Sequence, residues 1–380
     1  MKAPRRACDP PRVLGPWRLA ASLLSVSLLV SCAGPGSRFA PEGRHPVDVR
    51  AVIDKALPVA ISDRAGWTAD IAGSFTKLGV PPTRENACAV VAVIEQESGF
   101  QVDPVIPGLG RLALRTIDAR ATRAGVPLAL VHAALDLKSS DGRTYRVRIK
   151  AARTEKQLSD VYEDFFGRVP LGRRLFASWN PIRTRGPMQV NVAFAERFES
   201  IKPYPYHDSR HDLRDELFTR RASVYFGIAH LLDYQASYDR YLYRFADYNA
   251  GQYASRNAAF QRAASIAAGV PLTADGALLA QDPRAEGAGS TERVLFAIAR
   301  RLRLSRAEID KALEQGMDQS FEQTPLYRRV FELADRRSGQ RLPRAILPRI
   351  RLEGPKIVRP LTTAWYARRV NDRFERCVRE

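Results

Sequence analysis

A glutamate at the end of a short apolar helix is the residue of this sequence best suited to acid–base chemistry. Residues 83–100 read TRENACAVVAVIEQESGF, and Val90, Ile94 and Glu97 recur at the spacing of one helix face. A carboxyl group held against apolar neighbours resists ionisation, so its pKa rises and it can carry a proton at neutral pH. The pattern therefore makes Glu97 a candidate general acid and base.

Sequence signals at both ends fix the helix that carries Glu97. Thr83 has the side chain of an N-cap, because its hydroxyl can accept a bond from a free amide of the first turn. Gly99 ends the helix, which leaves Glu97 at the mouth of a cleft, whereas Glu95 lies roughly 200° around the helix and faces elsewhere. Two alternatives stay open: a strand, because the run VVAVI is β-branched, and an ordinary helix-end carboxylate at Glu97.

Three short segments, taken in order, point to one family. Residues 97–100 read ESGF, residues 186–190 read GPMQV and residues 248–251 read YNAG. On a mostly helical secreted chain they resemble the lytic transglycosylases of the goose-type lysozyme superfamily, which show Glu-Ser-x-Phe at a helix end, then Gly-Leu-Met-Gln, then Ala-Tyr-Asn-Ala-Gly. Residues 227–232, GIAHLL, approximate that family's intervening helix. The resemblance covers less than half of the chain.

The resemblance implies a role for each matching residue. Glu97 matches the family's catalytic acid and base. Amide side chains can read acetamido and hydroxyl groups through paired bonds, and a tyrosine hydroxyl can hold a protonated carboxyl group. The residues expected to bind substrate are Ser98, Met188, Gln189, Tyr248 and Asn249. Further aromatic residues available as sugar platforms are Trp179, Tyr204 and Tyr206.

Three features depart from the family pattern. The stretch from Phe100 to Gly186 is far longer than in family members, so we expect an insertion that covers one wall of the groove. Pro187 stands where the family has leucine, and Asp247 stands where it has alanine. As a carboxylate next to Tyr248, Asp247 is expected either to change the charge of the site or to face solvent.

The activity implied by the resemblance is cleavage of the β-1,4 bond between N-acetylmuramic acid and N-acetylglucosamine in peptidoglycan. Glu97 would protonate the leaving oxygen and then deprotonate the sugar's 6-hydroxyl, which closes a 1,6-anhydro ring without water. One carboxylate suffices, because the substrate's acetamido group can stabilise the intermediate. Two alternatives remain: a hydrolytic muramidase, and a lipoprotein that binds glycan or a partner without turnover.

Neither a metal nor another cofactor is expected. His207 and His211 stand four residues apart, as zinc ligands on a helix can. Pro203 and Pro205 beside them indicate a loop, however, and no third ligand is evident. No phosphate-cradling glycine-rich loop is present either.

The N-terminus predicts an exported lipoprotein. A basic segment precedes the apolar run at residues 19–30, which is short for a bilayer span and typical of a signal peptide. Residues 29–32 read LVSC and resemble the lipobox of bacterial lipoproteins, so we expect cleavage before Cys32 and a lipid on its thiol. By the sorting rule of that family, Ala33 in place of Asp suggests the outer membrane, and we expect the domain to face the periplasm; the sequence does not fix which face of the membrane it occupies. A plain signal peptide with an incidental cysteine is the alternative.

The net charge indicates which classes of partner the chain can bind, and the cysteines that remain after export can form a disulfide. The chain has 60 Lys and Arg against 41 Asp and Glu, a formal charge of +19, which suits anionic partners such as cell-wall polymer or anionic lipid. The basic residues are dispersed, so no nucleic-acid partner is expected. Cys88 and Cys377 remain in an oxidising compartment, where they either form a disulfide or stay as two buried thiols.

Helical periodicity dominates the chain, so the predicted fold class is all-α, with a lysozyme-like core, a long insertion and a helical C-terminal extension. Residues 212–234 are expected to form one long helix, and residues 144–149 alternate as a short strand would. The expected organisation is a signal peptide over 1–31, a lipid-anchored tether over 32–45, a glycan-cleaving domain over 46–270 with its insertion at 101–185, and the extension over 271–380.

Overall fold

The computed structural model describes residues 48–168, 180, 182–206, 212–279, 289–352 and 359–380. The chain divides into Met1–Pro46 and one compact unit, Val47–Glu380. The predicted signal peptide, Cys32 and the tether therefore lie outside the described residues, as do Trp179, His207 and His211.

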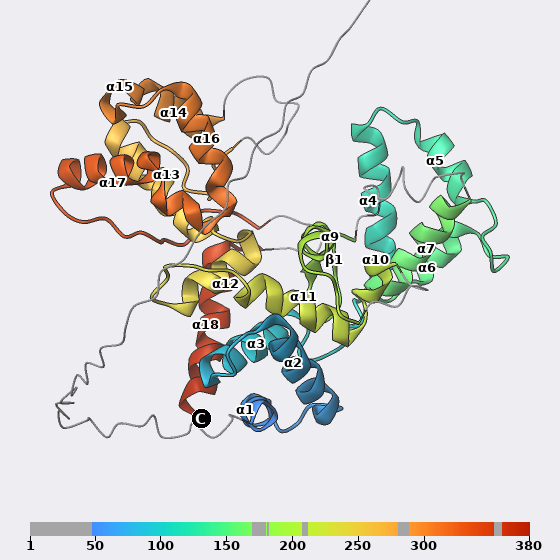
Figure 1. Cartoon of the computed structure of the whole chain (residues 1–380). Helices are drawn as coiled ribbons and strands as arrows, with labels where there is room; N and C mark the ends of the chain where they lie inside the picture. Colours follow the sequence, from blue (N-terminus) through green and yellow to red (C-terminus); the bar gives the residue numbers. More distant parts are fainter. Residues whose placement is uncertain (1–47, 169–179, 181, 207–211, 280–288, 353–358) are drawn as a thin grey trace, which may run out of the picture. The chain divides into compact units, whose positions relative to one another are not determined.

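The predicted all-α fold class is confirmed, because helices account for nearly all regular structure in the described residues (Figure 1). A two-stranded antiparallel sheet, β1 (Thr184–Arg185) and β2 (Val190–Asn191), is the exception among them. The α-helices are α1 (Val49–Ala56), α2 (Arg64–Leu78), α3 (Arg84–Glu97), α4 (Leu109–Arg123), α5 (Leu128–Leu135), α6 (Tyr145–Ala151), α7 (Glu155–Gly167), α9 (Val192–Ile201), α10 (Leu213–Glu216), α11 (Arg220–Leu232), α12 (Tyr241–Ala250), α13 (Ala254–Ala268), α14 (Ser290–Ala297), α15 (Ala299–Leu302), α16 (Arg306–Leu313), α17 (Pro325–Ser338) and α18 (Thr363–Arg379). Two 3₁₀ helices, η2 (Glu314–Met317) and η3 (Gln319–Gln323), precede α17.

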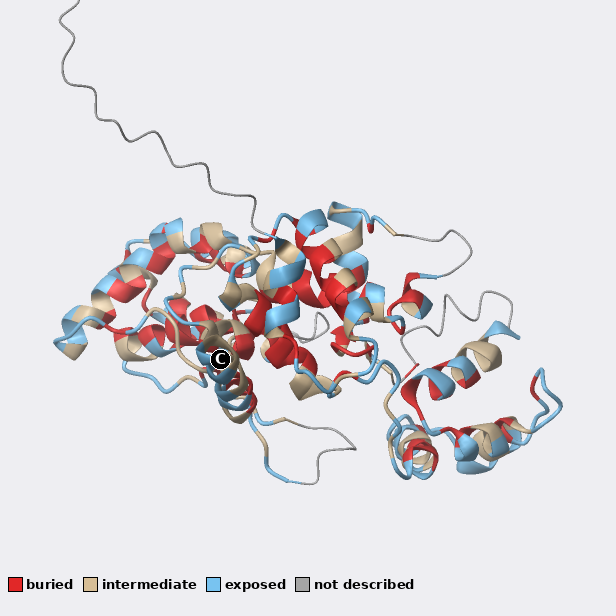
Figure 2. Cartoon of the chain, turned by 90° about the horizontal axis from the view of Figure 1, so that it is seen from below, coloured by how far each residue is buried: buried red, intermediate tan, exposed pale blue. Residues whose placement is uncertain are grey.

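The helix α3 is the centre of the first hydrophobic core. All of its residues from Ala87 to Ile94 are buried, so it is covered on every side and not along one stripe. It packs against α18, α1 and α11, while α18 also packs along α12 and α2 packs along α11 (Figure 1). Buried residues gather where helices face one another, and exposed residues cover the outer faces (Figure 2). Thr83 caps α3 as predicted, accepting a bond from the Asn86 amide at 3.1 Å.

The described residues form two further hydrophobic clusters. One is formed by α13 to α17, with Phe260, Phe321 and Phe331 among its fully or almost fully buried aromatic rings. The other belongs to the segment predicted to be an insertion, where α4, α5, α6 and α7 pack on one another around Tyr145 and Ile149. The insertion therefore has a small apolar core of its own.

Two local expectations are wrong. The alternating residues 144–149 form most of α6 and not a strand, because Thr144 caps the helix and Tyr145 and Ile149, one turn apart, both face the insertion core. The expected helix over 212–234 is interrupted after α10, and Thr219 begins α11 anew as its N-cap. Propensity alone does not show such breaks, since tertiary packing overrides it.

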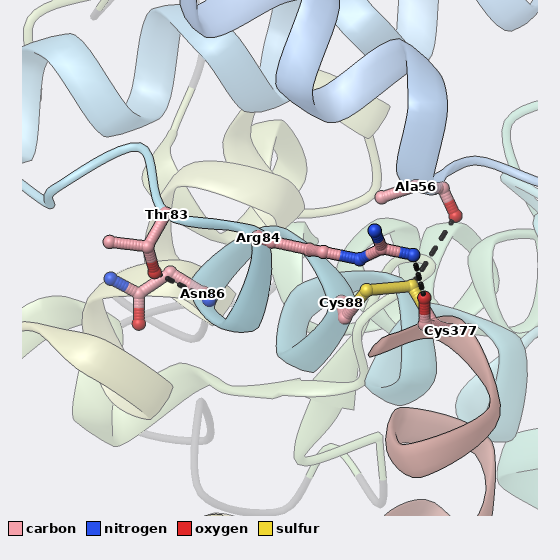
Figure 3. Close-up of a disulfide and its surroundings, with 6 residues drawn as sticks. All are labelled: Ala56, Thr83, Arg84, Asn86, Cys88 and Cys377. Atoms are coloured by element: carbon pink, nitrogen blue, oxygen red, sulfur yellow. Dashed lines mark hydrogen bonds between the residues drawn. A yellow bond between two sulfur atoms is a disulfide. The ribbon is translucent and has the colours of Figure 1, made fainter. Parts of the chain in front are cut away.

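The last helix returns to the first core and is cross-linked there. A disulfide joins Cys88 of α3 to Cys377 of α18, with the two Cα atoms 5.6 Å apart (Figure 3). Arg84 donates to the carbonyl oxygen of Cys377 at 3.2 Å beside it. Tyr366 and Val370 of α18 belong to the same buried cluster as α3. The final helix of the predicted C-terminal extension, residues 271–380, is therefore part of the first core.

Within the part of the chain that the structure describes, no helix combines the length and the apolar character needed to cross a membrane.

Candidate functional site

A sharp turn after α3 fixes the position of Glu97, the last residue of that helix. Gly99 and Phe100 both have left-handed backbone conformations, with φ of 58° and 64°. This conformation is strained for phenylalanine and persists only where packing holds it. Here the Phe100 ring is buried edge-to-face against Trp67 of α2, with ring centroids 5.2 Å apart. The aromatic contact therefore anchors the chain just beyond Glu97.

The carboxyl group of Glu97 has a raised pKa and a hydrogen-bond donor of its own. The side chain is only partly exposed, and this burial raises its pKa to about 7. The hydroxyl of Tyr366 on α18 donates to Oε1 at 2.5 Å and opposes the rise, whereas the negative charge of Glu155 adds to it. Near neutral pH both the protonated and the ionised form of Glu97 are therefore accessible.

Glu97 opens on a cavity of about 630 Å³, within the size range of small-molecule sites. Polar side chains line much of it, four of them amides, and this composition suits a ligand rich in hydroxyl and acetamido groups. The lining residues are Glu97, Thr184, Gln189, Asn191, Ala193, Phe194, Arg197, His230, Tyr248, Asn249, Ala250, Gly251, Gln252 and Met317. Four residues predicted from the sequence motifs, Glu97, Gln189, Tyr248 and Asn249, thus meet at one cavity.

The β1–β2 hairpin presents Gln189 to the cavity. Gly186 opens its turn at φ 71°, and a Cβ there would lie 2.2 Å from the carbonyl oxygen of Leu217, so only glycine fits. Gln189 closes the turn with a positive φ of 50°. Its amide oxygen accepts from Thr184 at 2.8 Å and its amide nitrogen donates to Glu155 at 3.2 Å. The Gln189 side chain is therefore held in place before any ligand binds.

The C-terminal end of α12 supplies Tyr248 and Asn249. The hydroxyl of Tyr248 donates to the carbonyl oxygen of Met188 at 2.6 Å, so it ties α12 to the hairpin and not to Glu97. The amide oxygen of Asn249 accepts from the hydroxyl of Thr363 on α18 at 2.7 Å. The tyrosine that contacts the carboxyl group is instead Tyr366, which lies outside all three motifs.

Two of the residues expected to bind substrate do not face the cavity. The side chain of Met188 is fully buried against Gly227, where a Cβ would lie 2.4 Å from its sulfur. Met188 therefore contributes its backbone carbonyl and its packing. The hydroxyl of Ser98 donates back to the carbonyl oxygen of Ile94 at 3.2 Å and caps the end of α3.

The expected aromatic platforms also differ from those in the structure. Tyr204 and Tyr206 pack around Tyr225 of α11, away from the cavity lining. Phe194 and His230 supply the aromatic rings of the lining in their place, together with Tyr248.

Asp247 takes neither of its two predicted positions, because it is fully buried and faces neither the cavity nor solvent. It accepts bonds from the hydroxyls of Tyr234 and Tyr238, at 3.1 and 2.7 Å, and from the amides of Tyr253 and Ser255, at 3.0 and 2.7 Å. Burial raises its pKa to about 6, and these bonds counteract the rise. Asp247 therefore joins α12 to the start of α13.

The second carboxylate near the site is Glu155, which sequence reasoning missed. It is the first residue of α7 in the insertion, is almost fully buried, and accepts the bond from Gln189 described above. Its charge helps to raise the pKa of Glu97. No motif surrounds it, so only the fold reveals it. Glu95, by contrast, points away as predicted and pairs with Arg373 of α18 at 3.1 Å.

One wall of the cavity carries an imidazole and a guanidinium. His230 of α11 stacks between Phe194 and Tyr248, with ring centroids 4.4 and 5.0 Å apart. Burial, together with the positive charge of Arg197 on α9, lowers its pKa to about 4. The imidazole is therefore neutral at physiological pH.

A second cavity, of about 240 Å³, lies within the insertion among α4, α5, α6 and α7. Its lining is almost entirely apolar, and the described residues in it include no carboxylate, histidine, cysteine or lysine side chain. Among the described residues, no group of three or more His, Cys, Asp or Glu side chains is placed to hold a metal ion.

Comparison with known proteins gives one family and one curated relative. Residues 60–380 match a family described as "Protein of unknown function (DUF1615)". The chain is 46% identical over 359 residues to the "Uncharacterized protein YaiW" of Escherichia coli (strain K12), and the match covers 94% of this chain and 97% of that protein. No solved structure matches.

Proposed function

This chain belongs to the DUF1615 family, and we propose that it cleaves peptidoglycan glycan strands at the β-1,4 bond between N-acetylmuramic acid and N-acetylglucosamine. The observation that carries the proposal is Glu97: a carboxyl group with a pKa of about 7 that opens on a cavity lined by amide side chains. A general acid works best when its pKa lies near the working pH. The proposal includes a lysozyme-like arrangement of the helices around α3.

In the proposed reaction, protonated Glu97 donates its proton to the leaving glycosidic oxygen as the bond to the muramic sugar breaks. The acetamido group of that sugar stabilises the positive charge at the anomeric carbon. The Glu97 carboxylate then takes the proton of the sugar's 6-hydroxyl group. At the same time the 6-oxygen of the sugar bonds to the anomeric carbon, which closes the 1,6-anhydro ring. Glu97 is thereby restored to its starting form.

The neighbours of Glu97 support both proton transfers. The Tyr366 hydroxyl donates to Oε1 and so stabilises the carboxylate that forms after the first transfer. Gln189 is fixed by Thr184 and Glu155, so it can meet a sugar without reorganising. Asn249, which is exposed at the cavity, offers a further amide to the glycan.

The location that we propose follows from the N-terminal sequence. A lipid on Cys32 would anchor the domain to the outer membrane through the tether at 33–45, on its periplasmic face. Peptidoglycan lies in that compartment, so anchor and substrate are compatible. The basic surface of the chain also suits an anionic polymer.

Digestion of purified peptidoglycan, followed by mass analysis of the products, tests the proposal. Products with 1,6-anhydro ends indicate lytic cleavage. Products with reducing ends instead indicate a hydrolytic muramidase. If intact sacculi release no product with the native protein, yet bind it, the chain is a glycan-binding lipoprotein and the proposed activity is wrong.

A further inference from the structure

The cavity beside Glu97 contains one side chain with a permanent positive charge. Among the lining residues, Arg197 and His230 are the basic side chains, and His230 is neutral. Arg197 is exposed and lies on the same face of α9 as Ala193 and Phe194, which also line the cavity. The structure records no acidic partner for its guanidinium among the described residues.

The position of Arg197 is set by the elements around it. Asn191 caps α9 by accepting from the Phe194 amide at 3.2 Å, and the Phe194 ring stacks on His230. One turn further along α9, Arg197 lies close enough to His230 to lower its pKa. The groups that act on Glu97 are instead Tyr366 and Glu155. Arg197 therefore acts on His230, whereas burial, Tyr366 and Glu155 set the pKa of Glu97.

We propose that Arg197 binds a carboxylate of the substrate near the cleaved bond, so that the cavity selects acidic glycans over neutral ones. This proposal rests on the proposed function, because it specifies the substrate of the same site. A guanidinium with unoccupied donors, next to neutral amides and a neutral imidazole, is suited to a carboxylate. In peptidoglycan the carboxylate has two possible sources: the lactyl group of the muramic sugar when no peptide is attached, and the stem peptide when one is.

Binding is measured in the Glu97→Gln background, in which no cleavage alters the ligand. The probes are glycan oligomers freed of peptide, which expose the lactyl carboxylate, oligomers with intact stem peptides, and neutral oligomers of N-acetylglucosamine of equal length. Adding Arg197→Gln is expected to weaken binding of at least one acidic probe by about 5- to 20-fold, the range of a partly exposed charge-assisted bond. Binding of the neutral oligomer is expected to change less than about 2-fold.

Two control variants separate a specific contact from general charge. Arg262→Gln on α13 removes an exposed arginine that does not line the cavity, so it should leave all three affinities nearly unchanged. Arg197→Lys keeps the charge but not the planar guanidinium, so it should keep only part of the preference for the acidic probe. The acidic preference should also weaken from 50 to 300 mM salt in the parent and not in Arg197→Gln, where the charge is gone.

The outcomes decide the proposal and leave the proposed activity to its own assay. The acidic probe that responds to Arg197→Gln identifies the source of the carboxylate. Equal weakening of acidic and neutral probes would overturn the proposal, and so would equal effects of the Arg197 and Arg262 variants. If the native protein does not cleave sacculi while the acidic preference depends on Arg197, the activity is wrong and the carboxylate site stands. If the native protein cleaves sacculi and shows no acidic preference that depends on Arg197, the proposed activity stands and the carboxylate site is wrong.

Discussion

The hydroxyl of Tyr366 donates to the carboxylate of Glu97 at 2.5 Å, although 269 residues separate the two in the chain. The contact joins the last helix, α18, to the helix that carries the candidate acid. It also explains why the disulfide between Cys88 and Cys377 matters for the site, since both bridges link α3 to α18.

Replacing Tyr366 tests this contact. The Tyr366 hydroxyl lowers the pKa of Glu97, so Tyr366→Phe should raise that pKa and move the basic limb of the pH–rate profile to higher pH. The lost stabilisation of the carboxylate should reduce kcat by about 10-fold, as expected for a hydrogen bond to a charged group. Tyr241→Phe is the matched control, because that hydroxyl bonds to Asn86 outside the cavity lining.

Replacing Glu155 should shift the pKa of Glu97 in the opposite direction. Its negative charge raises the pKa of Glu97, so Glu155→Gln should lower that pKa and move the basic limb to lower pH, while Gln189 keeps a partner. A pH–rate profile over pH 5 to 9 measures the position of the basic limb for both variants, Tyr366→Phe and Glu155→Gln. Basic limbs that coincide for the parent, Tyr366→Phe and Glu155→Gln would show that Glu97 does not govern the profile.

A pair of glutamates on α3 tests the catalytic assignment. Glu97→Gln keeps the shape of the side chain but cannot exchange a proton, so it should remove cleavage and preserve folding and glycan binding. Positioned proton transfer contributes about 10²- to 10⁴-fold. Glu95→Gln should be nearly silent, because Glu95 faces Arg373 and not the cavity. Sacculus digestion with equal amounts of each variant gives the answer, and full activity in Glu97→Gln would refute the assignment.

The raised pKa of Glu97 also predicts a stability effect with a definite sign. Because its folded-state pKa, about 7, exceeds the ordinary value of 4.5 for glutamate, the stability it contributes is present below pH 4.5 and is lost as pH rises through 7. Glu97→Gln should therefore be more stable than the parent at pH 8, by at most on the order of 3 kcal/mol. Urea unfolding at pH 4 and pH 8 measures this, and an equal difference at both pH values would contradict it.

The disulfide is expected to stabilise the fold and the site together. The bond closes a loop of 289 residues, for which the chain-entropy model gives on the order of 5 kcal/mol, and usually less in practice. The double variant Cys88→Ser with Cys377→Ser should unfold at lower denaturant concentration and lose activity as Tyr366 loosens. Thiol counting on the denatured, unreduced native protein checks the bond first, since two free thiols from these residues would exclude it.

Lipidation of Cys32 is a prediction from the sequence alone. Mass spectrometry of the mature N-terminus should find a diacylglyceryl-modified Cys32 as the first residue, and Cys32→Ala should no longer fractionate with membranes. A mature chain that begins elsewhere without a lipid would contradict the lipobox.

Local sequence determined the features that depend on neighbouring residues. The all-α class and the course of α3 from its Thr83 cap to Glu97 follow from side-chain spacing and capping, which act over one or two helical turns. The motifs also pointed to Glu97, Gln189, Tyr248 and Asn249, which do meet at one cavity. The orientation of Glu95 away from the cavity follows from helix geometry in the same way.

Only the tertiary structure decided which groups act on Glu97 and which motif residues face the cavity. Tyr366 and Glu155 come from distant segments without motifs, so no local pattern could reveal them. Met188 and Asp247 sit inside motifs yet are fully buried, because burial depends on what packs against a residue and not on its own sequence neighbours. A helix end can be read along the chain, but the pKa of the carboxylate it carries is set by groups that only folding brings together.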